Sequence, residues 1–340
     1  MNRSRRITAN LLRLALAAVV LFWLFRKLGG HELLDALKES LIHWHWLLAA
    51  HLLMLLPLAI CMLRWKLILN SQSMPLTWPR VAAIFMIGQF FNTFMLGATG
   101  GDLMKAWYTA RASHQRKAEA VTTIVLDRFA GLLGLLLLIT FILLARLPFF
   151  LSHRETRLVA LLLLAVCATV FVGTLLLLRT PIIPWLLRHP RLRSRFTNPI
   201  VFIERIYSVF RTWAARPTLL AQTVGLSLAM QLISVASSIC YGHALGVSIR
   251  IWDYLTFLPL ANSMGAIPAT PGGIGIREAV SVQLLGALQV RPETAFLLPF
   301  LPAFSLILWS LAGGLVFLFY RQSATTSINM DSATRVAPLS

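Results

Sequence analysis

Charged residues are scarce in this chain, and their scarcity argues against an ordinary soluble protein. Asp, Glu, Lys and Arg make up 13% of the 340 residues, whereas 58% are hydrophobic. A soluble domain carries about 25% charged residues. Several apolar runs reach the roughly 20 residues that a helix needs to cross a bilayer. We therefore predict an all-α, polytopic integral membrane helix bundle without an attached soluble catalytic domain.

Cysteines and acidic residues are also few. The three cysteines, Cys61, Cys167 and Cys240, are scattered through apolar runs, which does not fit a metal cluster or a disulfide framework. The 31 Lys and Arg residues outnumber the 12 Asp and Glu residues, giving a net charge of +19. Because this charge falls in short segments between apolar runs, it indicates positive cytoplasmic loops and anionic lipid rather than nucleic acid. We predict no nucleic-acid partner, no metal and no cofactor.

The apolar runs predict six full spans, and the positive loops predict their orientation. The spans are expected at about 7–26, 46–69, 118–145, 156–178, 218–241 and 294–320. The first resembles a signal peptide but is long for one and lacks a convincing cleavage site, so we predict an uncleaved helix. Amphipathic surface helices are expected within 29–45 and 198–213. With the basic loop 179–217 placed inside, both chain termini are predicted to be cytoplasmic.

Two similar segments interrupt the apolar pattern. The first runs from Asn92 through an apolar stretch to Ala-Thr99-Gly100-Gly101-Asp102. The second runs from Asn262 to Ala-Thr270-Pro-Gly272-Gly273. Breaks of this kind are costly at membrane depth unless the backbone lies within protein or lines a cavity.

Each break is predicted to form a re-entrant, broken-helix hairpin. Positive charge flanks 80–117 on both sides, so this segment should enter the membrane and return to the cytoplasm. The second hairpin, within 251–290, should enter from the outside. Two hairpins of opposite direction form an inverted repeat, the arrangement by which many secondary transporters alternate access to a midplane site.

Ionisable residues near these breaks are candidate functional groups, because a charge at membrane depth costs a few kcal/mol or more. They are Asp102, Lys105, Asp127, Arg128, Arg277 and Glu278. Neighbours in a helix point about 100° apart, so we expect that Asp127–Arg128 and Arg277–Glu278 are not closed pairs and that one member of each finds a partner across the bundle. Those partners could be structural or could be a substrate, and Lys105 could instead snorkel to the interface.

The glycine pairs suggest an anion site. Glycine permits a positive φ and a close approach of backbone N–H groups to a ligand. A helix that starts directly after such a turn presents its positive end to an anion. Here the natural anion is a lipid phosphate, and the alternative is a tight turn without ligand. No nucleotide-binding phosphate loop is present, and no Asp-x-Asp motif suggests a metal-dependent glycosyltransferase.

These motifs together resemble one known family. Phe91-Asn92, Gly100-Gly101-Asp102, Lys105, Asp127-Arg128 and Thr270-Pro-Gly272-Gly273 with Arg277-Glu278 occur in the order found in the lysylphosphatidylglycerol synthase transmembrane region, also called the flippase-like domain. Arg64-Trp65 adds to the resemblance, which covers about 10–320. The chain departs from the family pattern at two places. Leu96-Gly97 stands where a Pro often precedes the glycine pair, and Lys105 stands where Arg is common. The resemblance implies handling of polar lipids in the bacterial cytoplasmic membrane, with a lipid-synthesising enzyme as a candidate partner.

The combined prediction is one flippase-like domain over 1–320, with halves at about 46–178 and 218–320 and a disordered polar tail at 321–340. Its expected activity is the binding and translocation of a polar lipid or lipid-linked intermediate. Substrate contacts are expected from Asn92, Thr99, Asn262, Thr270, the four glycines and the six ionisable residues near the breaks. One alternative is a membrane-embedded transferase with Asp102 or Glu278 as base. Another is a non-transporting scaffold for a lipid-modifying enzyme.

Overall fold

The protein is a bundle of helices. The computed structural model describes residues 30–94, 100–113, 117–152, 154–179, 197–265 and 275–334. Over these ranges the regular structure is α-helix, without a strand. The predicted all-α class is therefore confirmed. The first predicted span, the centre of the basic loop and the last six residues lie outside the described ranges.

Four helical segments are long and apolar enough to cross a membrane. They are Trp44–Ser71, Ala118–Ala145, Pro217–Ala244 and Pro292–Tyr320. They correspond to four of the predicted spans and establish a multi-pass membrane protein. A fifth helix, α9 (Arg154–Arg179), carries the shorter apolar stretch Ala160–Leu176 at the predicted fourth span.

The first described span consists of two helices, α3 (Trp44–Leu53) and α4 (Leu55–Ser71), which meet at Met54. This break lies about one turn before Pro57. A proline ring clashes with the carbonyl four residues before it, so the helix yields at that point and Pro57 occupies the first turn of α4.

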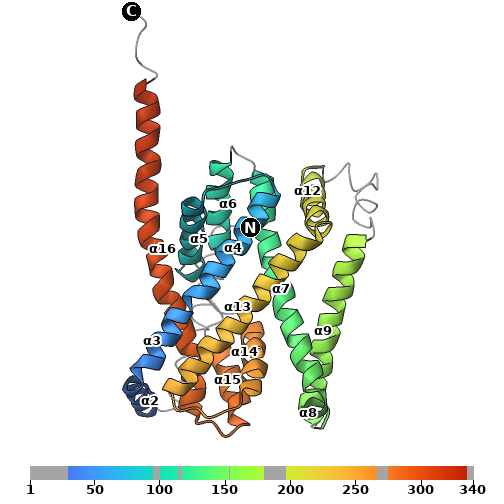
Figure 1. The fold of residues 1–340 in the computed structure, drawn as a ribbon, viewed down its shortest axis with the longest axis vertical. Helices are drawn as coiled ribbons and strands as arrows, with labels where there is room; N and C mark the ends of the chain where they lie inside the picture. Colours follow the sequence, from blue (N-terminus) through green and yellow to red (C-terminus); the bar gives the residue numbers. More distant parts are fainter. Residues whose placement is uncertain are drawn as a thin grey trace, which may run out of the picture.

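The long helices α7 (Lys117–Ala145), α13 (Pro217–Ala244) and α16 (Pro292–Thr334) frame the bundle (Figure 1). The described part of α16 extends to Thr334, so its backbone is helical over 321–334, where the sequence predicts a disordered tail. Large apolar side chains such as Phe141, Leu158 and Leu162 are exposed on the outside of the bundle. An apolar exterior of this kind suits a lipid environment.

Two short hairpins fill opposite halves of the bundle. One consists of α5 (Trp78–Phe94) and α6 (Gly100–Ala112), in the upper half of Figure 1. The other consists of α14 (Ile251–Gly265) and α15 (Ile276–Gly286), in the lower half. At 1.5 Å per residue these helices reach only about 17–25 Å, short of the ~30 Å hydrocarbon core. Both occur where the sequence predicts hairpins, and their re-entry into a membrane stays a prediction.

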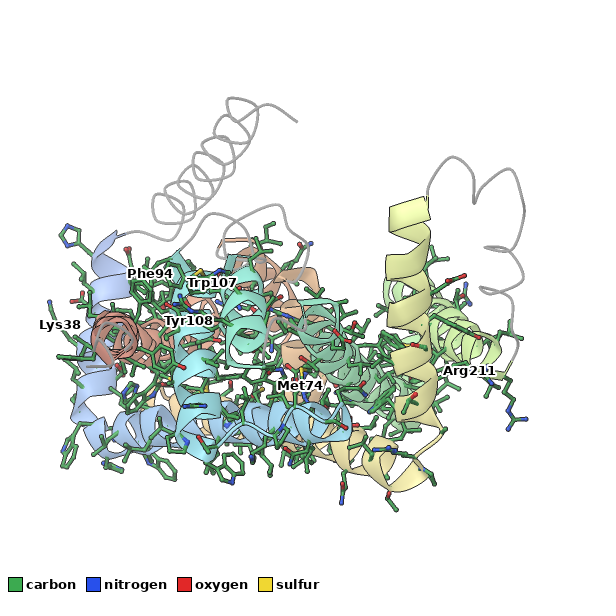
Figure 2. All side chains as sticks on the ribbon, turned by 90° about the horizontal axis from the view of Figure 1, so that it is seen from above. Lys38, Met74, Phe94, Trp107, Tyr108 and Arg211 are labelled. Atoms are coloured by element: carbon green, nitrogen blue, oxygen red, sulfur yellow. The ribbon has the colours of Figure 1, made fainter. Side chains whose placement is uncertain are left out.

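Amphipathic helices lie at the two ends. α2 (Gly30–Ile42) buries Leu33 and Ala36 at the lower end, whereas α12 (Thr197–Ala214) lies at the upper end beside α7 (Figure 1). Viewed along the bundle, Arg211 of α12 and Lys38 of α2 lie at opposite edges (Figure 2). The six-residue helix α8 (Leu147–Ser152) connects α7 with α9. Both predicted surface helices are present.

Candidate functional site

In the first hairpin, two glycines, Gly88 and Gly101, allow the two helices to pack closely. A Cβ on Gly101 would lie 1.9 Å from the carbonyl oxygen of Gly88, and one on Gly88 would lie 2.5 Å from Lys105 Cγ. Only glycine allows α5 and α6 to approach this closely. Asn92 Oδ1 accepts a hydrogen bond of 2.9 Å from the Gly101 N–H. This bond occupies one free donor at the start of α6, so Asn92 has a structural role whatever else it contacts.

Asp102, the third residue of α6, is bound by an arginine from α7. Arg128 donates from Nε and Nη2 to the two Asp102 oxygens at 3.0 and 3.1 Å. The Arg128 side chain is 57% exposed and the Asp102 side chain 21%. This two-pronged pair fastens the first hairpin to α7 and leaves one side of the guanidinium open.

Asp127, next to Arg128, points into the bundle. Its Oδ1 accepts a 2.7 Å hydrogen bond from Arg64 Nε, and Arg64 Nη1 donates to Ser227 Oγ, also at 2.7 Å. Arg64 and Asp127 are both buried and connect α4, α7 and α13. A Cβ on Gly131 would lie 3.3 Å from Arg64 Nη1, so a glycine one turn after Asp127 makes room for the guanidinium.

Lys105 is buried rather than snorkelled. It is 7% exposed, and its ammonium lies 3.9 Å from the ring centroid of Phe85 and 5.4 Å from that of Trp65. The aromatic faces provide a cation–π environment. Lys105 makes no ion pair with any described residue, although Asp102 and Asp127 lie within electrostatic range.

The second hairpin has its own ion pair, and here the prediction about partners is wrong. Arg277 Nη2 donates to Glu278 Oε1 at 2.8 Å, because both side chains are long enough to bend toward each other. Glu278 is fully buried, and its Oε2 accepts the Gly275 N–H at 2.6 Å. Among the residues of this hairpin that the structure describes, Gly275 has a positive φ of 91°, directly before α15.

A cavity of about 190 Å³ lies where the second hairpin meets α13, α16 and the α3–α4 junction. Its polar lining consists of Gln231, Ser234, Ser238, Asn262 and Arg277. Apolar lining includes Leu258, Leu306 and three prolines, of which Pro299 and Pro302 lie inside α16. The cavity thus combines one cation with neutral hydrogen-bonding groups on an apolar background, the usual composition of a small-molecule site.

A polar stripe on α13 connects this cavity with the buried ion pair. Ser227 contacts Arg64, and Gln231, Ser234 and Ser238 follow at helical spacing to line the cavity. Residues three and four apart share one helix face. Reasoning from charged residues alone does not find this stripe, although its spacing is visible in the sequence.

The predicted residues therefore fall into separate groups. Asp102 and Arg128 form a pair on the first hairpin, Asp127 pairs with Arg64 between α4, α7 and α13, and Asn262 and Arg277 share the cavity. Gly100 and Gly101 open α6 without a positive φ, and Gly101 packs closely against α5. Thr99, Thr270, Gly272 and Gly273 lie outside the described residues.

Comparison with known proteins agrees with the sequence resemblance. Residues 10–311 match the family described as the lysylphosphatidylglycerol synthase TM region. A UPF0104 membrane protein from Methanothermobacter thermautotrophicus is 22% identical over 298 residues, which cover 83% of this chain and 85% of that protein.

Proposed function

The chain belongs to the family of the lysylphosphatidylglycerol synthase TM region, and from this premise we propose that it binds a polar lipid and moves it between leaflets. The family makes it a lipid-related membrane protein. The cavity beside Arg277 is the observation that supports binding most strongly. Its single cation would hold a phosphate, and the acyl chains would remain in the bilayer. Asn92, Thr99, Thr270 and the glycine pairs remain proposed contacts along the path of the headgroup.

The arrangement of ion pairs on α7 supports movement. Arg128 fastens the first hairpin through Asp102, and Arg146, directly after α7, fastens the second through Asp253 at 2.8 Å. At 1.5 Å per residue these arginines lie about 27 Å apart along the helix, close to the thickness of the hydrocarbon core. Opening one pair while the other stays closed would expose the interior to one side at a time.

The proposal includes an orientation. Both termini and the basic segment around α12 would face the cytoplasm of a bacterial cell, because positive loops remain on that side. A lipid-synthesising enzyme would then supply the substrate. The two candidate bases of a transferase, Asp102 and Glu278, each bind an arginine, and no observation favours that activity or a scaffold role over lipid movement.

Lipid movement in proteoliposomes tests the proposal. Fluorescent phospholipids are placed in both leaflets, and chemical quenching from outside reports the exchange rate. We expect faster exchange with the wild-type chain than in protein-free vesicles. Asp102→Asn and Arg277→Ala should lower the rate about tenfold or more, because each removes a charge-assisted hydrogen bond. Arg211→Ala, on exposed α12, is the control. Wild-type exchange equal to that of empty vesicles, with folded protein present, would refute translocation.

A further inference from the structure

The chemistry of the cavity wall identifies a class of headgroup. We infer that the cavity binds a monoanionic phosphate ester that also carries hydroxyl groups, in preference to one that carries an amine. This inference rests on the proposed function, because it assigns a substrate class to the same site. It follows from the donors and acceptors of five side chains.

Arg277 supplies the cation. Its Nε and Nη2 both donate to Glu278 Oε1, at 3.3 and 2.8 Å. A guanidinium has five N–H donors, so three remain after these two bonds. Glu278 fixes the plane of the guanidinium, and the open edge belongs to a side chain that lines the cavity. Such an edge suits two oxygens of one phosphate.

Carboxylates are absent from the described cavity wall. Glu278 does not line the cavity and is fully buried, with one oxygen bound by Arg277 and the other by the Gly275 N–H. An ammonium group in this cavity would lose its water, and the described wall offers it no carboxylate, because Glu278 is already bound by Arg277 and does not line the cavity. Burying an unpaired charge in this way is costly, so the cavity disfavours a headgroup that carries an amine.

The two serines require a donor from the ligand. Ser234 Oγ donates to the Met230 carbonyl at 2.9 Å, and Ser238 Oγ donates to the Ser234 carbonyl at 3.1 Å. With their hydrogens committed to the helix, these hydroxyls can only accept from a ligand. Hydroxyl groups on the headgroup would satisfy them without adding charge.

Two neutral amides complete the wall. The side chains of Gln231 and Asn262 make no hydrogen bond with another described residue. Each amide can both donate and accept, which suits a hydroxyl group. The cavity of about 190 Å³ is well above the ~10–15 Å³ that a single buried water requires on the same measure. It therefore has room for a small polar headgroup but not for acyl chains.

The test is lipid retention by the purified full-length chain, measured by native mass spectrometry. Three phospholipids with identical acyl chains are offered in equal amounts: phosphatidylglycerol, phosphatidylmethanol and phosphatidylethanolamine. Phosphatidylmethanol keeps the single negative charge but lacks headgroup hydroxyls. We expect phosphatidylglycerol to be retained about fivefold better than phosphatidylmethanol, the effect of one net hydrogen bond. Phosphatidylethanolamine should be retained least.

Variants assign the preference to the cavity. The double change Ser234→Ala and Ser238→Ala should bring the phosphatidylglycerol-to-phosphatidylmethanol ratio close to one. Ser237→Ala is the matched control, because the neighbouring Ser237 binds the Ala50 carbonyl and does not line the cavity. Arg277→Lys keeps the positive charge beside Glu278 but cannot donate two parallel hydrogen bonds to one phosphate. It should therefore weaken the retention of phosphatidylglycerol and of phosphatidylmethanol about tenfold and leave their ratio unchanged.

Three results would overturn the inference: equal retention of phosphatidylglycerol and phosphatidylmethanol by the wild type, equal or better retention of phosphatidylethanolamine, or an unchanged ratio in the double serine variant. Complete displacement of phosphatidylglycerol by millimolar glycerol phosphate would assign the cavity to a soluble phosphate ester instead. Selective retention without movement in vesicles would refute the proposed translocation and leave the headgroup class standing.

Discussion

The buried pair of Arg64 and Asp127 has the clearest energetic role of any two residues in the chain. Both are buried, and the guanidinium also binds Ser227, so three helices depend on one cation. Removing either partner leaves the other charge buried without a counter-ion, which typically lowers the free energy of unfolding by about 3–5 kcal/mol.

We predict that Arg64→Ala lowers the free energy of unfolding in detergent by about 3–5 kcal/mol. The double change Arg64→Leu and Asp127→Leu should cost less than the sum of the two single leucine changes, because neither charge is then left alone. The control Arg211→Ala should stay within about 0.5 kcal/mol. A double-variant cycle with no coupling between positions 64 and 127 would contradict this role.

At the residue scale, sequence reasoning found the groups but not all of their partners. The cost of intramembrane charge identified Asp102, Asp127, Arg128, Arg277 and Glu278. It could not reveal that Arg277 bends onto its neighbour, since that depends on side-chain rotamers. The neutral lining of the cavity, such as Gln231 and Ser238, carried no comparable signal, because single polar residues are common in membrane helices.

At the scale of elements, the hairpin of α5 and α6 depends on glycine contacts. The aromatic side chains Phe94, Trp107 and Tyr108 lie on this hairpin (Figure 2). Its closest approach is between Gly88 and Gly101, where a single added methyl group would strike backbone. Backbone cannot rotate aside as a side chain can, so the two helices would have to separate.

We predict that Gly101→Ala destabilises the protein by about 1–3 kcal/mol in thermal or denaturant unfolding. Gly225→Ala is the matched control, since nothing lies within 4 Å of its added Cβ in α13. That change should be neutral or stabilising by up to about 1 kcal/mol, because alanine favours a helix interior. Equal effects of the two substitutions would show that the close contact has no energetic weight.

The positions of both hairpins were predictable from the sequence because a Gly-Gly pair interrupts a span at each. The residues at which individual helices begin and end were harder to predict from the sequence. The break at Met54 and the two prolines within α16 show that proline marks a disturbance without fixing whether a helix ends or continues. Neighbouring helices decide that outcome.

At the scale of the whole molecule, two ion pairs join α7 and the residue that follows it to opposite hairpins, and in the proposed function they act as latches. The pair of Arg146 and Asp253 is supported by Thr256, whose Oγ1 lies 3.2 Å from Arg146 Nη1. Arg146 directly follows α7, whose C-terminal end is the lower one in Figure 1.

We predict that Asp253→Asn raises the labelling rate of a cysteine placed at position 262 by about twofold to fivefold, the effect of losing one partly exposed pair. The reporter is made in a background in which Cys61, Cys167 and Cys240 are replaced. An impermeant maleimide is applied to one side of the membrane at a time, and the increase should occur on the side of Asp253. Asp102→Asn should increase labelling from the other side. Increases on the same side for both variants would contradict opposed latches.

The proposed function requires that a lipid headgroup occupies the cavity beside Arg277 while the chain moves that lipid. The most direct measurement is photo-crosslinking of a phospholipid with a photoactivatable headgroup in vesicles, followed by mapping of the modified residues. We expect adducts on cavity residues of α13, α15 and α16, such as Ser234, Ser238 and Ala303, and unlabelled lipid should reduce their yield by competition. Adducts confined to the outer surface, for example on Leu161 and Leu175 of α9, would contradict the proposed function.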